Sequence, residues 1–172
     1  MTDESKKHVI AILVDNEFGA LARIVELFSA RGYNIESINC APINEDKTIS
    51  RITITTYGTS KTIDLICKLL NRIIPVHRAV ELTKEEGYIE RELALVKIIG
   101  DEDKRQEALK VVDKYRTSVV DITGDSIVFE IIGTSKMIDE ILLKLSTLGL
   151  EGVSRTGAAA GFKGEKKLDE SK

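Results

Sequence analysis

The chain has 172 residues, of which 42% are apolar and 31% charged, and its formal net charge is −3. This composition suffices for a packed core, and it excludes wholesale disorder and the basic surface that nucleic acid requires. No apolar run approaches the roughly 18 residues that cross a bilayer, and the first residues lack the apolar core of a signal peptide, so we expect a cytoplasmic protein with no membrane or nucleic-acid partner.

The first half of the chain alternates between strand and helix periodicity. An apolar run at 8–14 is followed by an amphipathic one at 21–32, which ends at Gly32, where a left-handed residue after a helix is expected. The turn-rich stretch PINEDK at 42–47 separates two β-rich runs. The pattern predicts, in order, strand, helix, strand, strand, helix and strand at residues 8–14, 19–31, 34–41, 48–57, 60–73 and 75–82.

An internal repeat indicates that the second half has the same organisation. GTSKTIDLICKLL at 58–70 aligns with GTSKMIDEILLKL at 133–145, and each copy follows a β-rich run. Ser60 and Ser135 occupy the position where N-cap residues are preferred. The alternative to a true repeat is a chance similarity between two ordinary strand–helix connections. The second half is predicted to repeat the order of elements at residues 92–99, 102–115, 118–122, 126–132, 135–148 and 150–155.

Both halves therefore have the βαββαβ order of the ferredoxin-like fold. The predicted fold class is α+β, with two such domains in tandem. Residues 1–83 form the first domain and residues 92–160 the second, and a polar linker over 84–91 joins them. We expect a flexible tail over 161–172.

The strand predicted over 8–14 is apolar on both faces. Right-handed connections put both helices of a half on one face of its sheet, so the other face lacks cover from its own half. A sheet with two apolar faces must bury both, so the second face, or an open edge strand, should contact another half or another chain. This argues for a homo-oligomer. The two sets of side chains are Val9, Ala11 and Leu13 on one face and Ile10, Ile12 and Val14 on the other.

The stretch DNEFGAL at 15–21 joins the first strand to the first helix. A helix start has unpaired N–H groups and a partial positive charge, so it accepts a carboxylate. Gly19 leaves these groups accessible, and the Asn16 amide can cap the helix or bind a zwitterion. The junction suits a small amino acid better than a nucleotide, and a capped turn with no ligand is the alternative. Apolar walls would come from Phe18, Ala20 and Leu21.

Residues suited to catalysis or metal binding are few. His8 and His77 are the two histidines, and neither has the spacing to Cys, Asp or Glu that indicates a triad or a zinc site. We expect both to be surface or strand-end residues, and Cys40 and Cys67 to be buried as small apolar residues. The sequence therefore favours a protein that is not itself an enzyme.

The segment DNEFGALARIVELFSARGYNIESINCAP at 15–42 closely resembles the first domain of acetolactate synthase (acetohydroxyacid synthase) small subunits. That domain is an ACT domain, a module that senses amino acids. The similarity continues through SRITI, VHRAVELT, ERELALVKI, VVDIT, EIIGTSKMID and SRTG, and so covers residues 8–157. The stretch AAAGFKGEK at 158–166 departs from the usual ending of the family.

The resemblance implies a regulatory subunit in branched-chain amino acid biosynthesis. Its partner would be the larger catalytic subunit, and thiamine diphosphate, Mg²⁺ and FAD would be carried by that partner, with no cofactor in this chain. This chain would activate the partner and confer feedback inhibition by valine or another branched-chain amino acid.

The resemblance also implies where the effector binds, between the ACT domains of two chains in a homodimer. One chain would contribute its loop and the other would contribute Asn34 and Ile35, although Asn34 is equally well explained as a turn residue. The rival readings are an ACT module that regulates a different enzyme or a transcription factor, and a structural dimerisation protein without a ligand. The loop residues are Asn16, Glu17, Phe18, Gly19, Ala20 and Leu21.

Overall fold

The computed structural model describes residues 4–84 and 87–168, and the chain divides into two compact units. Residues 1–89 and 159–172 form the first unit, which we call the first domain, and residues 90–158 form the second domain.

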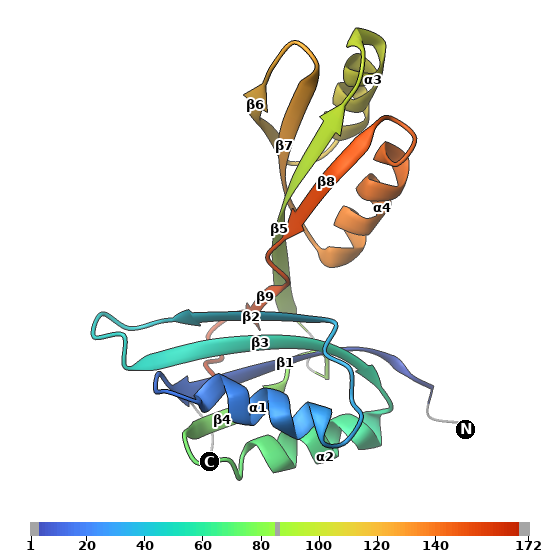
Figure 1. Ribbon diagram of the computed structural model, residues 1–172. Helices are drawn as coiled ribbons and strands as arrows, with labels where there is room; N and C mark the ends of the chain where they lie inside the picture. The colour runs from blue at the N-terminus through green and yellow to red at the C-terminus, as the bar shows by residue number, and fades with distance from the viewer. Residues whose placement is uncertain (1–3, 85–86, 169–172) are drawn as a thin grey trace. The chain divides into compact units, whose positions relative to one another are not determined.

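The first domain contains β1 (Lys6–Asp15), α1 (Ala20–Ser29), β2 (Ser37–Pro42), β3 (Ile49–Gly58), α2 (Ser60–Leu70) and β4 (Val76–Glu81). The strands form an antiparallel sheet in the order β2-β3-β1-β4, and both helices lie on one of its faces (Figure 1). β1 pairs with β3 along its whole length, from Lys6 opposite Gly58 to Asp15 opposite Ile49. The predicted βαββαβ order is confirmed.

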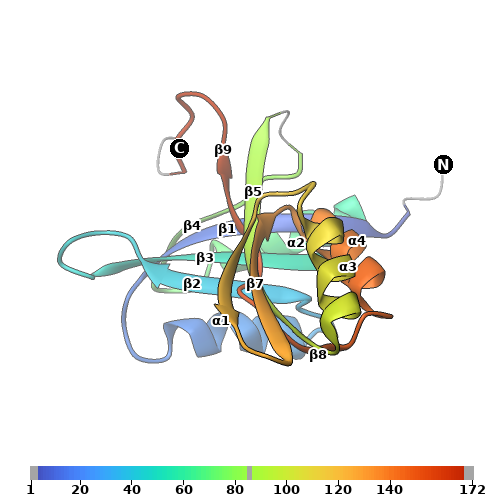
Figure 2. The ribbon, with the colours of Figure 1, turned by 90° about the horizontal axis from the view of Figure 1, so that it is seen from above.

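The second domain contains β5 (Tyr88–Ile99), α3 (Glu102–Val112), β6 (Thr117–Ile122), β7 (Ser126–Gly133), α4 (Ser135–Leu145) and β8 (Leu150–Arg155). Its strands follow the order β6-β7-β5-β8, and α3 and α4 lie on the same side of them (Figure 2). β5 begins within the first domain, at Tyr88, and the last strand of that domain, β9 (Ala159–Phe162), also pairs with β5. The tandem ferredoxin-like arrangement expected from the repeat is therefore present.

The segment predicted as a linker over 84–91 lies partly outside the described residues, and its described part differs from the prediction. β5 already begins at Tyr88, four residues before the strand expected at 92–99. Glu90 and Glu92 are both buried while their neighbour Arg91 is exposed. The alternation of buried and exposed side chains that is typical of a strand therefore continues through this charged stretch, although its composition is typical of a loop.

The repeated helices pack in the same way in the two domains. Ile63, Ile66 and Leu70 of α2 are buried against the apolar side chains of β1 and β3. The matching residues of α4, which are Ile138, Ile141 and Leu145, are buried in the second core. These residues recur at helical spacing and form the face that each helix turns toward its sheet.

The caps of these helices are displaced by one residue from the prediction. Ser60 and Ser135 are the first helical residues, and the N-caps are Thr59 and Thr134. Each threonine is extended, and its hydroxyl accepts a hydrogen bond from the N–H three residues later at 3.2 Å. In the shared sequence G-T-S-K, the threonine is therefore the residue that stabilises the helix start.

The second face of the first sheet is covered by the end of the same chain. Val9 and Ala11 are fully buried there, in a cluster with Leu168, which is 6% exposed. Phe162 packs on this cluster, and Arg51 Nη2 of β3 donates to the carbonyl of Ala160 at 2.5 Å. Cover that we expected from another half or another chain therefore comes from residues 159–168.

This cover also differs from the flexible tail expected over 161–172. The structure describes the tail as far as Leu168, and its apolar side chains lie against the sheet. The composition of the segment is mostly polar, but its apolar residues Phe162 and Leu168 pack on the sheet.

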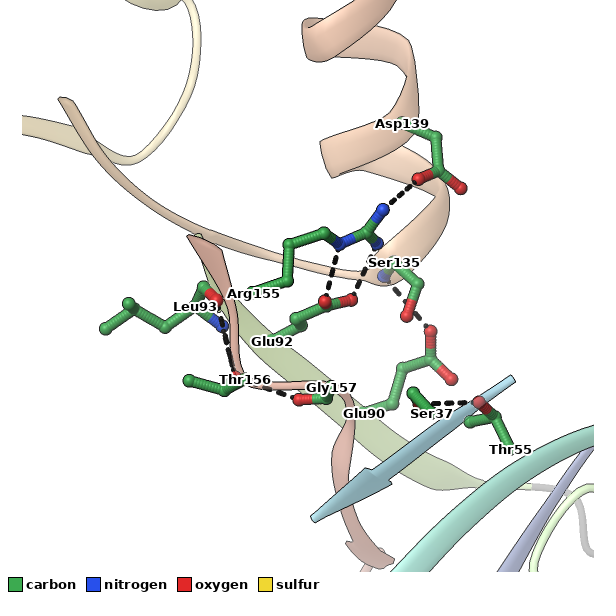
Figure 3. A network of polar contacts seen from close by, with 10 residues as sticks. All are labelled: Ser37, Thr55, Glu90, Glu92, Leu93, Ser135, Asp139, Arg155, Thr156 and Gly157. Atoms are coloured by element: carbon green, nitrogen blue, oxygen red, sulfur yellow. Dashed lines mark hydrogen bonds and ion pairs between the residues drawn. The ribbon is translucent and has the colours of Figure 1, made fainter. Parts of the chain in front are cut away.

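Charged side chains, of which Glu90 and Glu92 are buried, join α4 to the sheet of the second domain. Glu92 on β5 receives two hydrogen bonds from Arg155, from Nε at 2.7 Å and from Nη2 at 2.9 Å (Figure 3). Nη1 of Arg155 donates to Asp139 of α4 at 2.6 Å. The Glu90 carboxylate accepts from the N–H of Ser135 at 3.3 Å, at the start of α4. Burial opposes ionisation of Glu92, but the hydrogen bonds from Arg155 and Ser135 outweigh it and lower the Glu92 pKa.

We predict that Leu168→Ala destabilises the first domain by about 2 kcal/mol, because the truncation removes the apolar cover of Val9 and Ala11. Urea denaturation followed by circular dichroism measures the change. Leu143→Ala is the matched control, because Leu143 is 76% exposed. Equal unfolding midpoints for the two variants would show that the tail contributes nothing to the stability of the sheet.

We predict that Glu92→Gln changes how the stability of the second domain depends on pH. The folded-state pKa of Glu92 is lowered, so its stabilising contribution is present above the unfolded pKa of about 4.3 and is lost as the pH falls below it. Calorimetric melting between pH 3 and 7 should show a shallower acid decline in Glu92→Gln than in the wild type. The exposed Glu151→Gln should keep the wild-type slope, and a wild-type slope in both variants would contradict the assignment.

Candidate functional site

The loop between β1 and α1 exposes the start of a helix. Gly19 precedes the helix with a φ of +82°, and it makes no side-chain capping bond. Among the described residues, none accepts a hydrogen bond from the N–H groups of Leu21 and Ala22, whereas Arg23 N–H already donates to Gly19. Apart from Gly19 itself and its two neighbours in the chain, no atom of the described residues lies within 4 Å of the point that a Cβ at Gly19 would occupy. Two backbone donors are therefore open to a ligand.

Asn16 is exposed and is tied to the turn between β2 and β3. Its backbone N–H donates to Thr48 O at 2.7 Å, and its side-chain Nδ2 donates to Lys47 O at 2.7 Å. The sequence left open whether Asn16 caps the helix, and in the structure it does not. Within the described part of the chain, its Oδ1 accepts no hydrogen bond, so the amide presents an acceptor to a ligand.

The surface around the loop is hollowed and largely apolar. The side chain of Phe18 is fully exposed, and Leu21 and Val25 are about 40% exposed. Ala20 differs from the prediction, because its side chain is buried in the core and cannot form a wall of the hollow. The hollow is lined by Asn16, Glu17, Phe18, Gly19, Leu21, Ala22 and Val25.

Glu17 at the rim of the hollow forms a surface ion pair. Its Oε1 lies 3.2 Å from Arg23 Nη1, and both side chains are about half exposed. An exposed pair of this kind contributes little to stability.

Asn34 and Ile35 belong to the opposite end of the sheet. The carbonyl of Asn34 accepts a hydrogen bond from Thr56 Oγ1 at 2.6 Å, and Thr56 pairs with His8 near the start of β1. The loop follows Asp15, at the other end of that strand. Asn34 is exposed and Ile35 is half-buried against the first core. A single copy therefore does not bring these two sets of residues together.

The two histidines differ in their surroundings. His77 is half exposed on β4, and its Nε2 lies 2.6 Å from Asp15 Oδ1. His8, which we expected at the surface or a strand end, is fully buried, with Nδ1 2.5 Å from Glu81 and Nε2 3.1 Å from the carbonyl of Gly58. Its contacts hold strands together and do not face the hollow.

The cysteines and the possible metal ligands add no second site. Cys40 is exposed, contrary to the burial we expected, because the end of β2 lies at an edge of the sheet. Cys67 is half-buried, and burial, followed by the nearby Glu81, raises its pKa to about 12. In residues 4–84 and 87–168 no three His, Cys, Asp or Glu side chains gather as metal ligands, and no helix is long and apolar enough to cross a membrane.

The fold of the first domain and its open helix start are those of an ACT domain. The family model of the AHAS small subunit-like ACT domain matches residues 10–78. The model of the small subunit of acetolactate synthase matches residues 91–161. The chain therefore belongs to the family of acetolactate synthase small subunits, as the segment at 15–42 indicates.

Several relatives match along nearly their whole length. A probable acetolactate synthase small subunit of Archaeoglobus fulgidus is 35% identical over 161 residues, covering 94% of this chain and 99% of that protein. The acetolactate synthase isozyme 3 small subunit of Escherichia coli is also 35% identical, covering 93% and 98%. The crystal structure of the acetolactate synthase small subunit from Thermotoga maritima matches with a TM-score of 0.82 and 29% identity, covering 94% of this chain and 99% of that chain.

Two parts of the hollow were missing from the sequence-based expectation. Ala22 and Val25 line it from α1, and the helical spacing from Phe18 to Val25 was the signal that could have identified them. The second part is the connection between β2 and β3. The sequence predicts a turn there, but its composition does not show that its backbone carbonyls face Asn16.

Proposed function

We propose that this chain activates the catalytic subunit of acetolactate synthase and confers feedback inhibition by valine or another branched-chain amino acid. The observation that carries the proposal is the pair of open N–H groups at Leu21 and Ala22, beside an exposed amide and an apolar hollow, in a member of this family. Free amides at a helix start attract a carboxylate. The reaction itself, with thiamine diphosphate, Mg²⁺ and FAD, is assigned to the catalytic subunit.

A site shared by two copies explains why the candidate residues lie apart. Thr56, which holds Asn34, pairs with His8, and the loop begins after Asp15. Seven residues of extended strand separate the two ends by roughly 23 Å. An amino acid cannot bridge this distance, so Asn34 reaches a bound effector only from a second copy.

The edge of the sheet supplies a suitable way for two copies to meet. β2 is an edge strand, so one row of its backbone groups is open to pairing. Two β2 strands that pair about a two-fold axis run antiparallel, so the beginning of one lies beside the end of the other. Asn34 precedes β2, while Pro42 at its end lies on the side of the loop. A homodimer of this type would bring Asn34 and Ile35 of one copy toward the loop of its partner.

Inhibition follows if the effector binds more tightly to one arrangement of the two copies. An effector shifts an equilibrium only by its differential affinity, and typical coupling is about 1–3 kcal/mol. The exposed side chains of Phe18, Leu21 and Val25 fit an aliphatic side chain. An apolar pocket of this kind discriminates by roughly 1–3 kcal/mol per methylene, so leucine and isoleucine would compete with valine.

We predict that Gly19→Asp removes inhibition by valine, because its carboxylate would occupy the place of the effector carboxylate and repel it. The variant is mixed with the cognate catalytic subunit, and acetolactate formation is measured over a valine series, each variant being compared with its own rate without valine. Gly19→Asn is the matched control, since asparagine tolerates a positive φ and carries no charge. If Gly19→Asp were inhibited at the valine concentrations that inhibit the wild type, the loop would not be the site. If the wild type neither activated the catalytic subunit nor responded to valine, the proposed function would fail.

We predict that two defective variants complement each other in a mixed dimer. A dimer of one Gly19→Asp chain and one Asn34→Ala chain has one site with both changes and one site with neither, so co-expression should restore high-affinity valine binding to about a quarter of all sites. Calorimetry on the mixture measures this fraction, and each variant alone serves as the control. A mixture that binds no better than its components would show that the loop and Asn34 do not share a site between copies.

A further inference from the structure

We propose that Asn44 is a positioning residue of the effector site, and that it holds the turn which orients Asn16 toward the ammonium group of an amino acid. This inference rests on the proposed function. It concerns the ammonium group of the effector, which the N–H groups of the helix start cannot recognise. The helix offers N–H donors, which suit a carboxylate, whereas an ammonium group needs acceptors.

Asn44 spans the turn between β2 and β3 with both atoms of its amide. Its Nδ2 donates to Thr48 Oγ1 at 2.7 Å, and its Oδ1 accepts from the N–H of Ile49 at 3.0 Å. Its own carbonyl accepts from the N–H of Lys47 at 3.1 Å. One side chain therefore fixes the residues at the far end of the turn.

The turn contains one residue that needs such support. Lys47 has a φ of +51°, in the left-handed region, and it is the non-glycine residue with a positive φ in the described part of the chain. A lysine gains nothing from this conformation by itself, so neighbouring contacts must maintain it. Without the Asn44 amide, the Lys47–Thr48 peptide would be free to adopt other orientations.

The carbonyls of Lys47 and Thr48 are the part of the turn that binds Asn16. The carbonyl of Lys47 accepts from Asn16 Nδ2 at 2.7 Å, and the carbonyl of Thr48 accepts from the backbone N–H of Asn16 at 2.7 Å. These two bonds fix both the backbone and the amide plane of Asn16. Because Nδ2 is directed to the turn, Oδ1 is directed away from it and remains an acceptor.

The two ends of an amino acid are then recognised by different elements. The open N–H groups of Leu21 and Ala22 suit the carboxylate, and Asn16 Oδ1 suits the ammonium group. The nearby carboxylate of Asp15 is bonded to His77, and that of Glu17 to Arg23. Asn16 therefore supplies the uncharged acceptor, and the turn decides where it points.

The test compares valine with 3-methylbutanoate, which has the same carboxylate and side chain but no ammonium group. Binding to the full-length wild type and to Asn44→Ala is measured by calorimetry. We expect Asn44→Ala to bind valine about tenfold more weakly, while its affinity for 3-methylbutanoate changes little. A purely structural defect would weaken both ligands by the same factor, so the ratio of the two affinities is the decisive readout.

Two further variants complete the experiment. Asn44→Asp keeps an acceptor for Ile49 N–H and can accept from the Thr48 hydroxyl, so it should restore the wild-type ratio. Glu45→Ala removes an exposed side chain from the same turn and should leave the ratio unchanged. An Asn44→Ala chain with the wild-type ratio would overturn the inference and leave the proposed function standing. A wild type that binds no branched-chain amino acid would overturn both.

Discussion

The buried His8 side chain fixes the register of β1 between its two neighbours. One ring nitrogen contacts Glu81 of β4, and the other contacts the carbonyl at the end of β3. Hydrophobicity alone would not set this register, since Val9, Ile10, Ala11 and Ile12 are all fully buried and both faces of the strand are apolar. A slip by one residue would move His8 to the other face and remove its contact with the buried Glu81 carboxylate. A polar contact therefore provides the specificity that an apolar strand lacks.

This register determines where the parts of the proposed site lie. β1 is paired with β3 as far as Asp15, so the loop leaves the sheet at a fixed point, and its residues meet the turn between β2 and β3. At the other end of β1, Thr56 lies opposite His8 and binds the carbonyl of Asn34. Because the sheet keeps the two sets of residues at opposite ends, a second copy is the natural means of joining them. Regulation through such a site would depend on how two copies sit together, and not on movement within one sheet.

The fold was largely predictable because its signals are local. Apolar periodicity and the repeated G-T-S-K segments predicted the two βαββαβ domains, and the apolar side of each repeated helix is its buried face. Features that depend on residues distant in sequence were not predictable. The cover of β1 comes from Phe162 and Leu168, the partner of His8 is Glu81, and the partner of Asn16 is a pair of backbone carbonyls, which no residue type reveals. The loop residues of the candidate site were identified through their resemblance to a family, because their chemistry alone favoured a capped turn with no ligand.

The two domains share one fold, but their first helices begin differently. α1 begins after Gly19, with no side-chain cap and no acidic residue in its first turn. α3 begins after Asp101, whose carboxylate accepts from the N–H of Lys104 at 3.0 Å, and Glu102 and Asp103 follow it. A carboxylate ligand at α3 would have to displace Asp101 and would be repelled by the two acids beside it. The acidic residues at the start of α3 therefore prevent a carboxylate from binding at this position of the second domain. The effector that we propose would bind at the uncapped helix of the first domain.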